Sequence, residues 1–179
     1  MPYVPPSAIA AGQMVTTAIM NVEWAGNIAF LANPPACRVY NSANQSIAHN
    51  ADVVVALNSE RYDTDSMHST VTNNSRITFN TAGLYVVTFS CEWATGTDYT
   101  QLTAFARLNG GTAITISDFG NRSGGAFGPY TSFATTYKFV VGDYVEAVVR
   151  QVNSASAARN LISSNAFSPE FSATWVGLG

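Results

Sequence analysis

The sequence has few charged side chains, and this scarcity argues against several classes of function. Asp, Glu, Lys and Arg make up 11% of the 179 residues, with 8 Lys plus Arg against 11 Asp plus Glu. A globular chain ordinarily carries about 25% charged residues. Nucleic-acid binding needs cations clustered against phosphates, and here they are scattered, with Lys138 the single lysine. We therefore expect no nucleic-acid partner.

Long hydrophobic runs, a cationic leader and abundant cysteine are also missing. The longest apolar stretches fall well short of the roughly 18 residues that a membrane-spanning helix needs, so we expect no membrane insertion. Residues 1–12 have no cationic region, so we expect no secretory signal there. The two cysteines, Cys37 and Cys91, lie in apolar, strand-like runs. We expect two buried free thiols, with a disulfide as the alternative.

Apolar residues, by contrast, are plentiful. Hydrophobic residues make up 47% of the chain and aromatic residues 12%. A chain of this length buries about 70% of its unfolded surface, which is enough for a full core without disulfides or metals. The polar share is carried by Ser, Thr, Asn and Gly, which is typical of a neutral β-rich protein.

The N-terminal part, residues 1–34, predicts an arm followed by one amphipathic helix. Prolines and a glycine in residues 1–12 favour an extended arm. Helical spacing follows over residues 15–31, with a threonine cap at its start and Asn33-Pro34-Pro35 at its end. We expect an attachment face on Val15, Ala18, Ile19, Val22 and Ala29. A helix this short is marginal alone, so it must pack on its own domain, on two sister copies or on a larger assembly.

Residues 35–179 predict an all-β domain. Short runs rich in Val, Ile, Thr, Phe and Tyr alternate with Asn, Ser and Gly turns, and no helical period appears. The expected strands are 37–41, 52–58, 76–80, 84–93, 102–109, 113–118, 131–141, 144–152 and 171–177. Residues 153–168 read as a long connection or a short weak strand. This spacing predicts an antiparallel jelly-roll sandwich preceded by a short N-terminal helix.

No constellation of residues predicts catalysis, a metal centre or a cofactor. The two histidines, His49 and His68, lie in polar stretches, and we expect both to be solvated loop residues. Asp63, Asp65 and Asp98 offer carboxylates for a loop calcium, without the glycine and glutamate of an EF-hand. Nucleophile motifs are absent, so we expect no enzyme activity.

Several motifs in residues 36–177 resemble the globular head of the C1q/TNF-like family. In order along the chain they are Ala56-Leu-Asn58, Arg61-Tyr62-Asp63, Arg76-Ile-Thr-Phe79, Ala82-Gly83-Leu84-Tyr85, Gly142-Asp143-Tyr144-Val145 and Phe171-Ser-Ala-Thr-Trp175. Ala82 stands where the family commonly has proline, and Ala173 where it has the closing glycine. The resemblance implies a homotrimer and structural roles for Gly83, Leu84, Tyr85, Gly142, Asp143 and Phe171.

A second resemblance covers about twenty residues near the N-terminus. Gly12-Gln-Met-Val-Thr-Thr-Ala-Ile-Met-Asn21, followed by Asn27-Ile-Ala-Phe-Leu31, is similar to the opening of small tail, fibre or head-decoration proteins of actinobacterial phages. The basic residues usual between the two halves are replaced by Val22-Glu-Trp-Ala-Gly26. This resemblance implies a virion protein, assembled in the host cytoplasm, that contacts other capsid or tail proteins through its N-terminal segment.

Together the two resemblances imply a homotrimeric head displayed on a phage capsid or tail. A receptor- or glycan-binding module is the alternative, with apical-loop aromatics for stacking on sugars: Tyr62, Trp93, Tyr99 and Phe127. A bacterial surface or spore-coat protein with a C1q-like head is a further alternative. The sequence has no collagen-type Gly-X-Y stalk, which argues against it.

Overall fold

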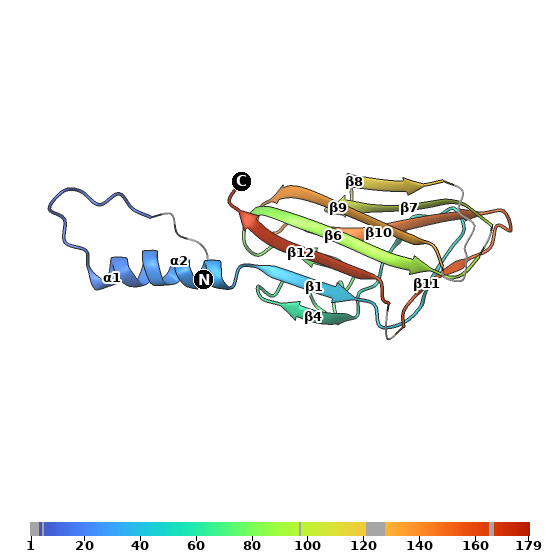
Figure 1. Cartoon of the computed structure of the whole chain (residues 1–179), viewed down its shortest axis with the longest axis horizontal. Helices are drawn as coiled ribbons and strands as arrows, with labels where there is room; N and C mark the ends of the chain where they lie inside the picture. Colours follow the sequence, from blue (N-terminus) through green and yellow to red (C-terminus); the bar gives the residue numbers. More distant parts are fainter. Residues whose placement is uncertain (1–3, 5, 97, 121–127, 165–166) are drawn as a thin grey trace. The chain divides into compact units, whose positions relative to one another are not determined.

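The computed structural model describes residues 4, 6–96, 98–120, 128–164 and 167–179. It divides the chain into two compact units, Met1–Pro35 and Ala36–Gly179 (Figure 1). None of the helices in the described part has the length and apolar character needed to cross a membrane.

The N-terminal unit contains one continuous helical stretch with an irregular centre. It is formed by α1 (Thr17–Ile19), a π-helical segment η1 (Met20–Ala25) and α2 (Gly26–Ala32). The Thr16 hydroxyl caps the start by accepting a hydrogen bond from the Ile19 N–H at 3.3 Å. The predicted helix is therefore present, although it begins at Thr17 and leaves Val15 just outside it.

The arm in front of this helix hydrogen-bonds back onto it. The Asn27 side chain accepts from the Val4 N–H and donates to the Val4 carbonyl, at 3.0 and 2.8 Å. The Ser7 N–H donates to Glu23 at 2.9 Å. Hydrogen bonds from the Ser7 side chain and backbone lower the pKa of the Glu23 carboxyl. Of the predicted attachment residues, Ile19 is half-buried, whereas Ala18, Val22 and Ala29 are exposed. The covered side of the helix is thus the side of Glu23 and Asn27.

The second unit is built from β-strands. Their bounds are β1 (Ala36–Tyr40), β2 (Gln45–Ile47), β3 (Val53–Val54), β4 (Ser59–Asp63), β5 (Arg76–Thr78), β6 (Gly83–Trp93), β7 (Tyr99–Leu108), β8 (Thr112–Phe119), β9 (Tyr130–Phe139), β10 (Tyr144–Asn153), β11 (Arg159–Ile162) and β12 (Glu170–Gly177).

These strands form two antiparallel sheets. The larger sheet has the order β2-β11-β6-β12-β1-β4, with β9 also paired to β6. The smaller sheet has the order β3-β10-β7-β8, with β5 also paired to β10. Figure 1 shows them as two layers, in which the long strands of one sheet face those of the other. The jelly-roll sandwich expected from the sequence is confirmed.

Aromatic side chains fill the space between the sheets. Phe79, just after β5, stacks on Phe139 of β9 with 3.7 Å between ring centroids. At the other end, Trp93 of β6 and Tyr99 of β7 meet edge to face at 6.2 Å. Burying a large side chain of this kind stabilises a fold by about 2–3 kcal/mol, so these contacts hold the two layers together.

A tight turn between β9 and β10 explains one of the family-like motifs. Gly142 has a φ of +91°, a conformation that side chains other than glycine rarely adopt. The Asp143 carboxylate accepts from the Val140 N–H at 3.0 Å and from the Asn109 side chain at 2.8 Å. These bonds tie the turn to the neighbouring hairpin between β7 and β8.

The sequence prediction erred at the sheet edges. The predicted strand 52–58 is only β3, Val53–Val54, and the chain pairs again at β4, which had been missed. In β4 the three central residues are all exposed, and the pairing of β1 with β4 shifts between Arg38 and Val39. Such a bulged edge strand has no alternation of apolar and polar residues to reveal it. The short strand β2 was missed as well.

Candidate functional site

The outer face of the larger sheet carries two rows of polar side chains. One row crosses Thr88 of β6, Ser172 of β12, Arg38 of β1 and Tyr62 of β4, which are paired strand by strand. The Thr88 and Ser172 hydroxyls lie 2.7 Å apart. Because side chains alternate along a strand, the partners on the other face are core residues such as Phe171 and Val39.

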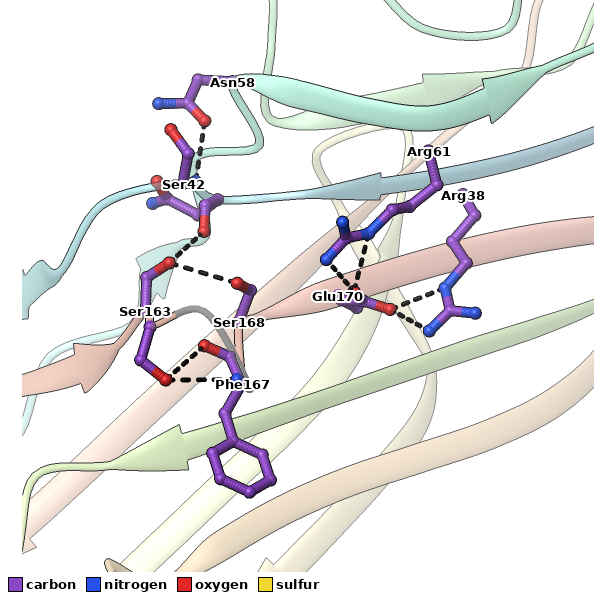
Figure 2. Close-up of polar contacts among 10 residues, drawn as sticks. Arg38, Ser42, Asn58, Arg61, Ser163, Phe167, Ser168 and Glu170 are labelled. Carbon is purple, nitrogen blue, oxygen red and sulfur yellow. Dashed lines mark hydrogen bonds and ion pairs between the residues drawn. The ribbon is translucent and has the colours of Figure 1, made fainter.

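Glu170, in the neighbouring row, is held between two arginines (Figure 2). Arg38 donates to one carboxylate oxygen from Nε at 2.6 Å and also from Nη2. Arg61 donates to the other oxygen from Nε at 3.1 Å and from Nη2 at 2.9 Å. The Arg61 guanidinium also lies 4.0 Å from the centroid of the Tyr40 ring. The cluster of Arg38, Arg61 and Glu170 has a net charge of +1, since two cations share one carboxylate.

Two hollows adjoin this cluster, and both are lined in part by Arg38 and Glu170. The larger one, about 300 Å³, is lined by residues that include Tyr62, Ser172 and Glu170. The smaller one, about 190 Å³, is lined by residues that include Tyr130, Phe167 and Glu170. We refer to the two hollows and their lining as the outer groove. Tyr62, Tyr130 and Phe167 are each about 45% exposed, so aromatic rings border a polar floor.

A network of serine hydroxyls positions the Phe167 side of the outer groove (Figure 2). Ser163 donates to the Asn41 carbonyl at 2.7 Å and contacts the Ser168 hydroxyl at 3.2 Å. The Phe167 N–H donates to the Ser164 hydroxyl at 3.2 Å. Phe167 in turn meets Tyr130 edge to face, with 5.9 Å between centroids. These hydrogen bonds within the connection from β11 to β12 therefore hold Phe167 in place beside Tyr130 of β9.

Tyr130 is also affected by an acidic neighbour in the outer groove. Partial burial, followed by a hydrogen bond with Glu92 and the charge of that carboxylate, raises the pKa of Tyr130. The Tyr130 hydroxyl therefore stays protonated near neutral pH and can donate a hydrogen bond. Arg, Glu, Ser, Thr and Tyr together give the groove both donors and acceptors beside apolar rings.

Two of the four aromatics predicted to bind sugars lie in the core instead. Trp93 and Tyr99 have no exposed surface, and their polar atoms are satisfied internally, by Thr131 and the Ala94 carbonyl. Burial raises the pKa of Tyr99 to about 12. Trp93 takes an inward position in the β6 alternation. Tyr99 is out of step with the buried residues Leu102 and Ala104 of β7, and it turns inward where the pairing of β7 with β10 shifts register. Tyr62 is exposed and borders the outer groove, whereas Phe127 lies outside the described residues.

His68 is not the solvated loop residue expected from the sequence. Its side chain is fully buried, with Nδ1 2.9 Å from Glu60 and Nε2 3.2 Å from the Asn74 carbonyl. Both ring nitrogens therefore face acceptor oxygens. Through these two contacts the ring connects the loop after β4 to Glu60 and Asn74. His49 is half-buried, and its Nδ1 accepts from the Asn153 N–H at 3.4 Å.

The three aspartates considered for calcium do not come together. Asp63 accepts from the N–H groups of Asp65 and His68, at 3.1 and 2.9 Å, and caps the loop that follows β4. Asp98 instead pairs with Arg159 at 2.7 Å. Within the described ranges, no three His, Cys, Asp or Glu side chains are grouped as metal ligands.

Both cysteines are buried and free, as expected. Burial raises the pKa of each thiol, and Cys91 reaches about 12, although a contact with the Thr131 hydroxyl at 3.1 Å partly opposes this. The two thiols therefore remain protonated and unreactive near neutral pH.

The residues of the family-like motifs occupy structural positions. Tyr85 and Phe171 are in the core, and the Tyr85 hydroxyl donates to the Thr81 carbonyl at 2.8 Å. Gly83 begins β6 and packs against Trp175, while Leu84 lies on the outer face of the sheet. The sequence did not reveal the cluster of Arg38, Arg61 and Glu170. Glu170 lies 132 residues after Arg38 and 109 residues after Arg61, and no local motif connects it to them.

Comparisons with known proteins were made for sequence and for structure. No protein-family model matches this sequence, and no curated protein sequence matches it. Solved structures do. The globular domain of zebrafish complement 1qA protein is 13% identical, with a TM-score of 0.56, and the alignment covers 81% of this chain and 99% of that domain. Eiger TNF from S. frugiperda is 14% identical, with a TM-score of 0.55 and coverage of 81% and 94%.

These similarities establish the fold. The chain has a C1q/TNF-like jelly roll, with strands β1, β12, β6 and β9 side by side in one sheet and β10, β7 and β8 in the other.

Proposed function

We propose that this chain is a non-enzymatic structural protein of a bacteriophage particle, a homotrimeric C1q/TNF-like head carried on the capsid or tail by its N-terminal segment. The similarity in fold supports a C1q/TNF-like head. The family resemblance implies that three such heads assemble into a trimer. The resemblance of Gly12–Asn21 and Asn27–Leu31 to phage openings supports the virion and assembly in the host cytoplasm.

The outer face of the larger sheet is the surface we assign to contact between the copies. Many of the strand aromatics, such as Tyr85 and Phe133, fill the core and are not available for contact between copies. The exposed aromatics Tyr62, Tyr130 and Phe167 border the outer groove. Arginine and aromatic residues are enriched where proteins meet, and an obligate interface buries more than about 2,000 Å² in total.

Removing residues 1–33 should abolish incorporation into particles and leave the β unit folded. The reason is that Ala36–Gly179 is a compact unit with its own core, whereas the N-terminal unit carries the phage-like segment. The measurement compares tagged full-length and truncated chains in purified particles, and a melting curve of the truncated chain serves as the control. Truncated chains that decorate particles at the wild-type level would contradict attachment through the N-terminal segment.

A saccharide ligand on a host surface is the second candidate function. It would use the larger hollow in place of the contact between copies, since one surface cannot serve both. Tyr62 offers an exposed ring beside Ser and Thr hydroxyls, Arg38 and Glu170, the kinds of groups that hold a sugar by stacking and by hydrogen bonds. Titrating Tyr62→Ala and wild-type chains with host cell-wall polysaccharide tests it. Equal binding by both chains, or none by either, removes this candidate.

A further inference from the structure

The N-terminal helix has a side lined by large apolar side chains that the described residues of its own unit leave exposed. Met20, Trp24, Ile28 and Leu31 recur at spacings of four, four and three residues. Residues at these spacings are neighbours on the helix surface both in the π-helical turns of η1 and in the α-helical turns of α2, so the four lie along one side. Their side chains are between 41% and 66% exposed. We call these four residues the helix stripe.

The described part of the arm contacts another side of the helix. Its hydrogen bonds to the helix go to Glu23 and Asn27, and the buried residues of α2 are Gly26, Asn27 and Phe30. These residues lie on a different side of the helix from Trp24 and Ile28. A short helix that exposes a tryptophan and three large aliphatic side chains needs a partner surface to be stable in water.

Charge restricts which partner fits. Glu23 is the only charged side chain between residues 1 and 35, and it is bonded to the arm. Without Lys or Arg, the segment does not attract nucleic acid or an anionic membrane surface. A charged protein partner would have to bury its own charges against apolar side chains, at a cost of several kcal/mol for each ion.

We infer that the helix stripe packs against the same stripe of two other copies of this chain, forming a parallel three-helix bundle. Around a threefold axis each residue lies near its own copies, so any charged side chain on the contact face meets a like charge. The helix stripe contains none. This inference rests on the proposed homotrimer and names a second contact that holds it together.

The inferred seam differs from the alanine-containing face expected from the sequence. Ala18, Val22 and Ala29 lie on a further exposed side of the helix. Alanine seams bury little area, whereas Trp24 and Ile28 each bury a large side chain. A cysteine placed on the helix stripe or on the alanine-containing face distinguishes the two possible seams. Only a residue at the seam approaches its own copies closely enough to form a disulfide.

The experiment uses the full-length chain with Ile28→Cys, and with Ala29→Cys as the matched control next to it on the exposed helix surface. The native thiols are buried and protonated, so the introduced cysteine is the one that reacts under mild oxidation. We expect Ile28→Cys to form disulfide-linked pairs at least tenfold faster than Ala29→Cys on non-reducing gels. Faster pairing of Ala29→Cys, or equal rates, would overturn the inferred seam.

Two further measurements on the wild-type chain separate the remaining outcomes. Trp93 and Trp175 are buried and Trp24 is 54% exposed, so acrylamide quenching reports mainly on Trp24. We expect Trp24 to be shielded in the trimer and freely quenched in an Ile28→Asp variant. A trimeric mass with freely quenched Trp24 overturns the bundle but leaves the proposed head trimer standing, whereas a monomeric mass overturns the proposed trimer itself. Flotation of the wild-type chain with phosphatidylcholine vesicles would assign the helix stripe to a membrane and also overturn the bundle.

Discussion

Replacing Gly83 with alanine should destabilise the β unit by more than about 4 kcal/mol, enough to lower its melting temperature by roughly 10 °C or to prevent folding. Gly83 has a φ of +152°, and an added Cβ would lie 2.1 Å from Trp175 Nε1 and 2.6 Å from the Gly177 carbonyl oxygen. The second atom is backbone of β12 and cannot rotate away. The start of β6 would have to separate from β12, which is its neighbour in the sheet.

Gly120→Ala is the matched control for this substitution. Among the described residues, and leaving out its chain neighbours, no heavy atom lies within 4 Å of a Cβ added at Gly120. The melting temperature of Gly120→Ala should therefore stay close to that of the wild type. The measurement is thermal unfolding followed by circular dichroism for both variants. Equal melting temperatures for Gly83→Ala and the wild type would show that β6 and β12 do not approach each other in this way.

Replacing Glu170 with lysine should dissociate the trimer, with a loss of affinity of at least 100-fold. Each oxygen of Glu170 accepts from a different arginine, so the substitution places a third cation beside Arg38 and Arg61. If the outer groove lies between copies, these like charges are brought out of water together. Leaving one charge of a buried pair without its partner costs about 2–5 kcal/mol, and about 2.7 kcal/mol corresponds to 100-fold.

Asp118→Lys makes the same change of charge on the other sheet. Asp118 accepts from Gln101 at 2.9 Å and from Thr103 at 3.1 Å, on strand β8. We expect this variant to remain trimeric. Light scattering at a series of concentrations measures the oligomeric mass of both variants. If Glu170→Lys and Asp118→Lys form trimers to the same extent, the interface lies away from the outer groove.

The sequence was informative where burial is strongly periodic. In β6 the residues alternate strictly between buried and more exposed positions, and the predicted strand differs from the observed one by a single residue. The same periodicity accounts for Trp93, which was taken for a loop aromatic although its place in the β6 alternation points inward. Tyr99 is out of step with the buried residues Leu102 and Ala104 of β7, and its burial follows a register shift between β7 and β10 that no sequence pattern reveals.

The candidate site was much harder to predict. Arg38, Arg61 and Glu170 come from β1, β4 and β12, and their meeting depends on the register of both strand pairs. A shift of one residue in either pair would move one of these side chains to the other face. His68 was misjudged for a related reason, since its burial depends on the loop that links β4 to β5, and that loop has no periodicity.

The oligomeric mass of the full-length chain in solution tests the central proposal most directly. Multi-angle light scattering during gel filtration, repeated down to micromolar concentration, gives that mass without reference to shape. The account predicts three times the 19.0 kDa of the single chain at every concentration. A stable species of 19.0 kDa would contradict the homotrimeric head and, with it, the outer groove as an interface.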